Sequence, residues 1–321
     1  MRYLISALLL IGLAGCTANL EDSNKNADTD KENEVQFIDQ ESFPPEIKRE
    51  GNTVYITMYT TQNKIEIAEG KYYQGWTFDG TVPGPVLRIK EGDTVRFTLI
   101  NKDPLMPHSM DFHAAKTPWD KNYIDIEPGE SFTYDWKAEI PGAYMYHCGT
   151  APVLAHIANG MYGAIIVDPA NDQQFEEARE FVLVQSEFYR DANDIDDMMN
   201  GEPQVVAFNG KAFKYDKDNP LEAEPGELIR FYVVNAGPNN FSAFHIVGTI
   251  FDKVYFNANP KNIQYGAQTV TIPPGGSYAV ELRVEEEGFY PIVSHSFKDA
   301  MKGANGFLKI TQDAKDQPLA P

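Results

Sequence analysis

The stretch EGDTVRFTLINKDP, residues 91–104, carries the pattern that decides the fold. After a Gly-Asp turn, its β-branched, aromatic and aliphatic residues alternate with polar ones, as is typical of a strand that is buried on one face. The stretch PGELIRFYVVNAGP, residues 225–238, matches it without a gap. A second pair follows in each copy: IEPGESFTYDW (126–136) and IPPGGSYAVEL (272–282). The sequence therefore predicts two copies of one structural unit.

Short β-rich runs separated by Gly and Pro turns fill most of the remaining chain. They include TVYITMYT (53–60), GAIIVD (163–168), FVLVQSEFY (181–189) and YAVELRVE (278–285). This spacing of short strands is typical of β-sandwiches, and few helical patterns compete with it. We expect an all-β protein of two tandem sandwiches, the first at residues 46–170 and the second at 171–312, followed by a tail at 313–321. The boundary is expected at DPANDQQ, residues 168–174, where the strand pattern breaks.

The first sixteen residues, MRYLISALLLIGLAGC, resemble a secretory signal with Arg2 ahead of an apolar run. The run is too short to span a bilayer. Its end, LAGC, resembles the bacterial lipobox, in which the cysteine, here Cys16, becomes the lipid-modified first residue. The alternative is an ordinary signal peptide with an incidental cysteine, and either predicts export. Residues 17–45 are polar and acidic, so we expect a disordered tether.

The chain of 321 residues contains 47 acidic and 27 basic residues, which gives a formal net charge of −20. No basic stripe exists to meet phosphates, so nucleic-acid binding is excluded. An acidic surface fits two interpretations, solubility or attraction of a basic protein partner, and charge alone does not separate them.

The stretch YHCGTAPVLAHIANGM, residues 146–161, collects one of two cysteines and two of six histidines. Because Cys16 lies in the leader, Cys148 has no disulfide partner. A lone cysteine is a buried thiol, a nucleophile or a metal ligand. The nearby His156 and Met161 favour the last interpretation, because a thiolate, imidazoles and a thioether form the donor set of a trigonal copper site with a weak axial Met.

Strand geometry divides the histidines between two sites. Successive side chains on a strand point to opposite faces, so His147 and Cys148 cannot serve one metal, and two metals would lie roughly 11 to 12 Å apart. His108 and His113, five residues apart in PHSMDFH, divide in the same way if this segment is extended throughout. This partition predicts one copper at His108, Cys148, His156 and Met161, and a second at His113 and His147 with His295 as third ligand.

The second copy lacks the soft ligands. Aligning residues 146–161 with SHSFKDAMKGANGF, residues 294–307, pairs His147 with His295 and Cys148 with Ser296. The same alignment places Lys302 roughly opposite His156 and Phe307 opposite Met161. We therefore expect a copper site with thiolate and thioether ligands in the first copy alone.

These motifs resemble those of the copper-containing nitrite reductases, two-domain cupredoxins of the multicopper oxidase superfamily, over residues 43–311. The resemblance implies Greek-key sandwiches and two coppers per chain. It implies a type 1 copper at His108, Cys148, His156 and Met161, a type 2 copper at His113, His147 and His295, and catalytic roles for Asp111 and His245. Cys148 and His156 lie one residue closer together than in the best-known members, which leaves the colour and potential of the type 1 copper open.

The implied activity is dissimilatory, one-electron reduction of nitrite to nitric oxide and water, as in denitrification. The electron would pass from type 1 to type 2 copper through Cys148 and His147, from a donor such as a cytochrome c or small cupredoxin. The resemblance also implies a homotrimer with the type 2 site between chains, and the leader predicts a membrane-anchored lipoprotein in the cell envelope. The alternative is an electron-transfer cupredoxin with only a type 1 copper. A laccase-type oxidase is excluded, because the chain has no His-x-His pair.

Overall fold

A computed structural model describes residues 36–170 and 175–319. The leader with Cys16, most of the expected tether and residues 171–174 of the expected boundary lie outside the described residues. The compact unit begins at Phe37. Residues 36–45 form no regular element, yet the backbone N–H of Gln40 donates to the carbonyl of Gln62 and that of Ile38 donates to Gln74. The last residues of the expected tether therefore contact the first sandwich.

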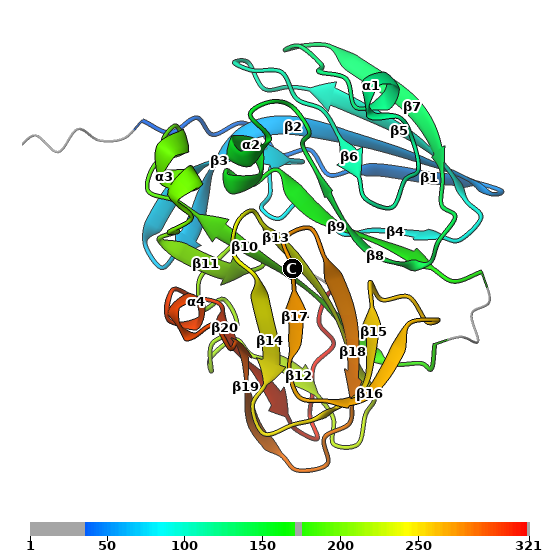
Figure 1. The fold of residues 1–321 in the computed structure, drawn as a ribbon, viewed down its shortest axis with the longest axis vertical. Helices are drawn as coiled ribbons and strands as arrows, with labels where there is room; N and C mark the ends of the chain where they lie inside the picture. Colours follow the sequence, from blue (N-terminus) through cyan, green and yellow to red (C-terminus); the bar gives the residue numbers. More distant parts are fainter. Residues whose placement is uncertain (1–35, 171–174, 320–321) are drawn as a thin grey trace, which may run out of the picture. The chain divides into compact units, whose positions relative to one another are not determined.

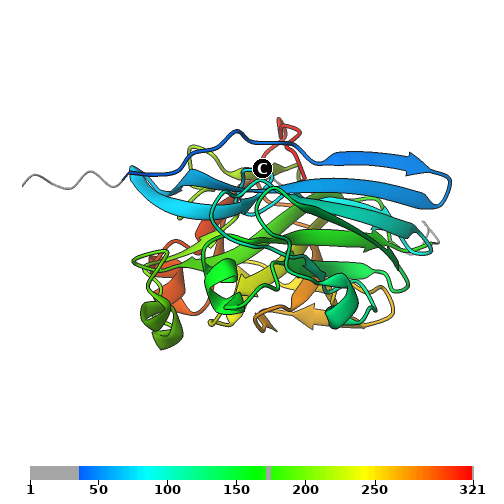
Figure 2. The same cartoon turned by 90° about the horizontal axis from the view of Figure 1, so that it is seen from above.

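The first sandwich consists of two facing sheets (Figure 1). One sheet has the order β1-β2-β5-β7, with β3 beside β2, and contains β1 (Glu46–Glu50), β2 (Thr53–Ala68), β3 (Lys71–Phe78), β5 (Thr94–Asn101) and β7 (Ser131–Lys137). The other has the order β4-β9-β8-β6 and contains β4 (Leu87–Lys90), β9 (Tyr162–Asp168), β8 (Gly142–His147) and β6 (Asp111–Phe112). Phe97, Phe112 and Trp136 pack between the sheets, and Figure 2 shows β1 and β2 along one outer edge.

The second sandwich repeats this plan. One sheet has the order β11-β10-β13-β18-β15-β16, with β11 (Val205–Phe208), β10 (Arg179–Phe188), β13 (Ile229–Gly237), β18 (Ser277–Leu282), β15 (Phe251–Phe256) and β16 (Ile263–Ala267). The other has the order β12-β20-β19-β14-β17, with β12 (Leu221–Ala223), β20 (Asn305–Ile310), β19 (Gly288–Ser294), β14 (Ser242–Ile246) and β17 (Val270–Ile272). The described helices are short: α1 (Trp119–Asn122), α2 (Val153–Ala158), α3 (Ile195–Asn200) and α4 (Phe297–Met301).

Strand β9 explains how the two sandwiches join. Its residues Ile165 and Val167 face the core of the first sandwich. Ala164 and Ile166 point the other way and pack against residues of β10 and β13 in the second sandwich. A strand that is buried on both faces needs apolar residues without alternation, which is why GAIIVD is almost entirely apolar.

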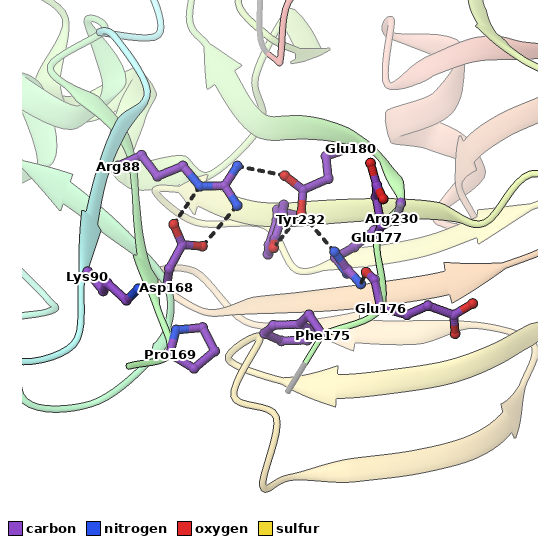
Figure 3. A pocket seen from close by; sticks show the side chains of 11 residues that line it. Arg88, Lys90, Asp168, Pro169, Phe175, Glu176, Glu177, Glu180, Arg230 and Tyr232 are labelled. Carbon is purple, nitrogen blue, oxygen red and sulfur yellow. Dashed lines mark hydrogen bonds and ion pairs between the residues drawn. The ribbon is translucent and has the colours of Figure 1, made fainter. Parts of the chain in front are cut away.

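Ion pairs bridge the same junction. The Arg88 guanidinium pairs with both oxygens of Asp168 at 2.8 and 2.9 Å and with Glu180 at 2.6 Å (Figure 3). Arg230 donates to the other oxygen of Glu180 at 2.8 Å. Arg88 and Asp168 belong to strands of the first sandwich, whereas Glu180 and Arg230 belong to β10 and β13. The network therefore ties the end of one sandwich to the start of the next.

Hydrogen bonds confirm the repeat in the central strands. The side-chain amide of Asn101 donates to the carbonyl of Ile126, and that of Asn235 donates to the carbonyl of Ile272. The backbone N–H groups of Asp103 and Gly237 donate back to these two asparagines. Asn101 and Asp103 are thus equivalent to Asn235 and Gly237, which lie 134 residues further along the chain.

In the ligand loop the structure corrects the sequence alignment. The backbone N–H of Cys148 donates to the carbonyl of Met161, and that of Ser294 donates to the carbonyl of Ala304. Cys148 therefore corresponds to Ser294 and Met161 to Ala304, so the pairings with Ser296 and Phe307 were wrong. The reason is physical: the second copy has a shorter loop, and an alignment of letters does not reveal which strand residues pair across it.

Candidate metal centres

Two groups of potential ligands come together in the described part of the chain, with their ligand atoms within 4.8 Å of one another. The first contains His108, Cys148 and His156; the second contains Asp111, His113 and His147. His147 and Cys148 fall in different groups, as the alternation of side chains along β8 predicts. His108 and His113 also separate, as expected.

The first group is buried completely. His108 lies where the chain forms an isolated bridge with Ile126, Cys148 follows β8, and His156 lies on α2. Their exposed fractions are 0%, 0% and 3%. Nδ1 of His108 lies 3.2 Å from Nδ1 of His156 and 3.8 Å from Sγ of Cys148.

The protonation of His108 follows from its other nitrogen. Nε2 lies 2.8 Å from the carboxylate of Asp103, which is also fully buried. A carboxylate accepts, so Nε2 carries a proton, and Nδ1 is the ring nitrogen that faces Cys148 and His156. Burial lowers the pKa of His108, but the hydrogen bond to Asp103 and the adjacent Cys148 outweigh it and raise the pKa to about 8.

The thiol is set up as a thiolate. Burial raises the pKa of Cys148, yet hydrogen bonding and charge from His108 and His156 outweigh burial and hold the pKa well below its ordinary value. The N–H of Ser109 donates to Sγ at 3.4 Å. A thiolate between two imidazoles is the donor set of a type 1 copper, so these residues fit that metal.

Met161 is fully buried and belongs to the same core. Its backbone joins Cys148 and His156 through hydrogen bonds of 3.1 Å each. Between His156 and Met161 the chain turns at Gly160, which has φ +116° and would place a Cβ within 2.5 Å of Val82. Only glycine fits this turn, which brings Met161 back beside Cys148.

The second group is open on one side, because His147 is buried while Asp111 is half-buried and His113 exposed. Nδ1 of His147 lies 2.8 Å from the carbonyl of Cys148, and Nδ1 of His113 lies 3.3 Å from that of Gly275. Carbonyls only accept, so both Nδ1 atoms carry protons. The two Nε2 lone pairs then face each other at 3.0 Å. Two lone pairs this close repel each other unless both bind a cation. Two imidazoles with an open side therefore suit a catalytic metal ion.

His295 and His245 lie elsewhere in the chain. Their rings lie edge to face on the second sandwich with centroids 5.6 Å apart, and Nδ1 of His245 contacts the carbonyl of Gln268. His295 is exposed at the end of β19. Within the described residues of one chain, His295 joins neither ligand group.

Sequence reasoning missed Asp103 and Ser109, although each lies within five residues of His108. The available signal was the repeat, because Asp103 matches Gly237 and therefore belongs to one copy only. No helix in the described ranges reaches the length and apolarity that a membrane span requires.

Comparison with known proteins identifies the class first. Two family models described as multicopper oxidase match residues 59–172 and 179–310, one for each sandwich. Both copies are therefore cupredoxin-type domains.

Individual relatives identify the family. A copper-containing nitrite reductase of Neisseria gonorrhoeae is 41% identical over 280 residues, which cover 83% of this chain and 71% of that protein. A solved copper nitrite reductase from Nitrosomonas europaea is 44% identical with a TM-score of 0.80, covering 82% of this chain and 95% of that one. One from Thermus scotoductus is 36% identical with a TM-score of 0.77, covering 82% and 63%. The chain belongs to the copper-containing nitrite reductase family.

Proposed function

We propose that this protein reduces nitrite to nitric oxide. The observation that carries the proposal is the pair of donor sets joined by one peptide bond: a buried cysteine sulfur with two imidazoles on one side, and two imidazoles whose Nε2 atoms face each other on the other. One set suits electron storage and the open set suits binding of a small anion.

The ligand roles follow this division. We assign His108, Cys148, His156 and Met161 to a type 1 copper, and His113, His147 and His295 to a type 2 copper. When bound, copper supplies one-electron redox chemistry and polarises a bound oxyanion. The chain fixes the ring orientations through Asp103, the Cys148 carbonyl and the Gly275 carbonyl.

Asp111 and His245 are our proposed proton donors. Nitrite takes up one electron and two protons to give nitric oxide and water, so two positioned acids match the stoichiometry. Asp111 Oδ2 lies 3.7 Å from Nε2 of His147, within the open group. The peptide between Cys148 and His147 is the shortest covalent link between the two donor sets, and we assign the electron route to it.

A carrier with only a type 1 copper is not favoured. A carrier of this kind would have no metal bound to the paired Nε2 atoms of His113 and His147. Copper analysis combined with an anaerobic nitrite assay tests the proposal. We expect two coppers per chain and production of nitric oxide; one copper per chain without turnover would identify a carrier.

The assembly is proposed to be a homotrimer with cyclic symmetry. His295 is exposed and joins no ligand group among the described residues of its own chain, so an adjacent chain would bring it to His113 and His147. Cyclic symmetry would then produce three equivalent sites.

The location is proposed from the leader, with lipid attachment at Cys16 in the cell envelope, on the periplasmic or outer cell surface. Residues 17–45 would act as the tether, and the two domains would divide within residues 168–174, after β9 ends at Asp168. The acidic chain suits a basic cytochrome c or a small cupredoxin as electron donor. Mass spectrometry of the membrane fraction tests the anchor.

A further inference from the structure

A buried carboxylate lies behind the first donor set, on the side of His108 that faces away from Cys148. Asp103 has an exposed fraction of 0%, and its Oδ2 lies 2.8 Å from Nε2 of His108. Gln62 Nε2 lies 3.0 Å from both Asp103 oxygens, and the N–H of Leu105 donates to Oδ1 at 2.8 Å. Burial of a carboxylate is costly unless donors surround it, and here they do.

The groups that reach the Asp103 oxygens are donors: the side-chain amide of Gln62, the backbone N–H of Leu105 and Nε2–H of His108. Donors that converge on both oxygens suit a carboxylate and not a protonated acid. The interior beside His108 therefore contains a fixed negative charge, one imidazole ring away from the thiolate.

The second sandwich offers an internal comparison. Gly237 is the equivalent of Asp103, because both N–H groups donate to the equivalent asparagines at 2.9 and 3.1 Å. That copy has Ser242 and Ser294 at the positions of His108 and Cys148. The carboxylate is thus present in the copy with the copper ligands and absent from the copy without them, although the fold forms in both.

We propose that Asp103 is a positioning residue for the type 1 copper: it holds His108 with Nδ1 toward the metal, and its charge favours the oxidised copper and lowers the reduction potential. The inference rests on the proposed type 1 ligands. A carboxylate that accepts from a ligating imidazole increases the basicity of that ligand. A nearby negative charge also stabilises the more positive oxidation state, and low polarity around the site strengthens both effects.

The test is a redox titration of the visible thiolate band in the copper-loaded full chain. Asp103→Asn retains the size and an acceptor for Nε2–H but removes the charge. We expect the ratio of oxidised-state to reduced-state copper affinity to fall about tenfold, which is a rise of about 59 mV in potential.

A second variant has the opposite expected sign. Gln62→Met keeps the length of the side chain but removes the donor to both oxygens of Asp103. The carboxylate then directs more of its charge toward His108, so the potential falls, with an expected change of about threefold in the same affinity ratio. If Asp103 had a purely structural role, the two variants would not shift the reduction potential in opposite directions.

The matched control is Asp93→Asn. Asp93 is another buried aspartate of this sandwich, but it pairs with Arg49 at the far end of β5. Its loss is expected to lower the melting temperature and leave the potential unchanged.

If Asp103→Asn and Gln62→Met leave the reduction potential unchanged, as the control does, the inference is overturned. If Asp103→Asn fails to fold, Gln62→Met alone decides, and an unchanged or raised potential overturns it. A copper-loaded wild type without the thiolate band overturns the ligand set together with this inference; a coloured wild type with unshifted variants overturns this inference alone.

Discussion

The two sandwiches share a hydrogen-bonding plan but differ at the positions where the first gathers its ligands. In the second sandwich Ser294 takes the place of Cys148 and Ala304 that of Met161, and Ser242 pairs with Ile272 as His108 pairs with Ile126. Ser109 donates to Sγ of Cys148 and Ala243 donates to Oγ of Ser294, both at 3.4 Å. The same backbone hydrogen bonds therefore form without the soft ligands, so the fold does not depend on them.

The same comparison relates the two proposed acids. Asp111 pairs with His147 across β6 and β8, and His245 pairs with Val293 across β14 and β19. Since Cys148 corresponds to Ser294, His147 corresponds to Val293 and Asp111 to His245. Equivalent positions in the two copies thus carry the two proposed proton donors. His295, by contrast, corresponds to Gly149 and not to His147.

The largest effect is expected when Cys148 of the first copy is replaced by serine, the residue that the second copy has at the equivalent position 294. Cys148→Ser should abolish the visible band completely, because the colour arises from thiolate-to-copper charge transfer. Copper at His113 and His147 should remain, since Cys148 faces the other way. Absorption spectra and copper analysis measure both outcomes.

The reciprocal variant, Ser294→Cys, serves as control. Cysteine alone should create no new band, because the second copy has Ser242 and Ala304 at the positions of His108 and Met161. A Cys148→Ser protein that keeps its colour would contradict the assignment of Cys148.

The next largest effect is expected at Asp111. Asp111→Asn keeps the shape but removes a proton donor, so nitrite turnover should fall by about two orders of magnitude. Both coppers should stay bound, and steady-state kinetics with metal analysis checks this. Asp135→Asn, at an exposed aspartate of β7, is the control with unchanged turnover expected. Full activity in Asp111→Asn would show a structural role.

Much of the site could be predicted because strands impose alternation. The division of His147 from Cys148 requires only that neighbouring side chains point to opposite faces. Asp103 could not be found in this way, since its distance from His108 depends on how an irregular loop folds. Nor does the sequence show which residues flank the shorter loop of the second copy, because residue types alone do not determine which backbone groups pair across it.

The assembly was beyond sequence geometry as well. Whether His295 meets His113 depends on a surface that either the same chain or another one covers. The resemblance to the family supplied that expectation, and the exposed position of His295 now supports it.

Trimers mixed from two inactive variants test whether the site of His113, His147 and His295 forms between chains. His113→Ala and His295→Ala chains should each be inactive alone. Coexpressed in equal amounts, they place an intact first domain against an intact second domain at about one site in four, if cyclic neighbours combine at random. Nitrite turnover should therefore recover to about a quarter of the wild-type value. No recovery in trimers verified by mass spectrometry would refute a site between chains and leave the ligands themselves unaffected.

The smallest expected effect concerns the junction of the two copies. Arg88→Met removes the guanidinium that pairs with Asp168 and Glu180, while Arg230 still neutralises Glu180. Arg88 is 38% exposed, so water screens these pairs, and the free energy of unfolding should fall by only about 1 kcal/mol.

Urea unfolding measures this loss. Arg96→Met is the control, because Arg96 forms an exposed ion pair with Asp135 between β5 and β7 of a single sheet. The control should lose about half as much or less. Colour and turnover should not change in either variant, since the apolar contacts of β9 with β10 and β13 still hold the sandwiches together. A large loss of turnover in Arg88→Met alone would mean that the ion pairs, and not the apolar contacts, set the relation between the two copies.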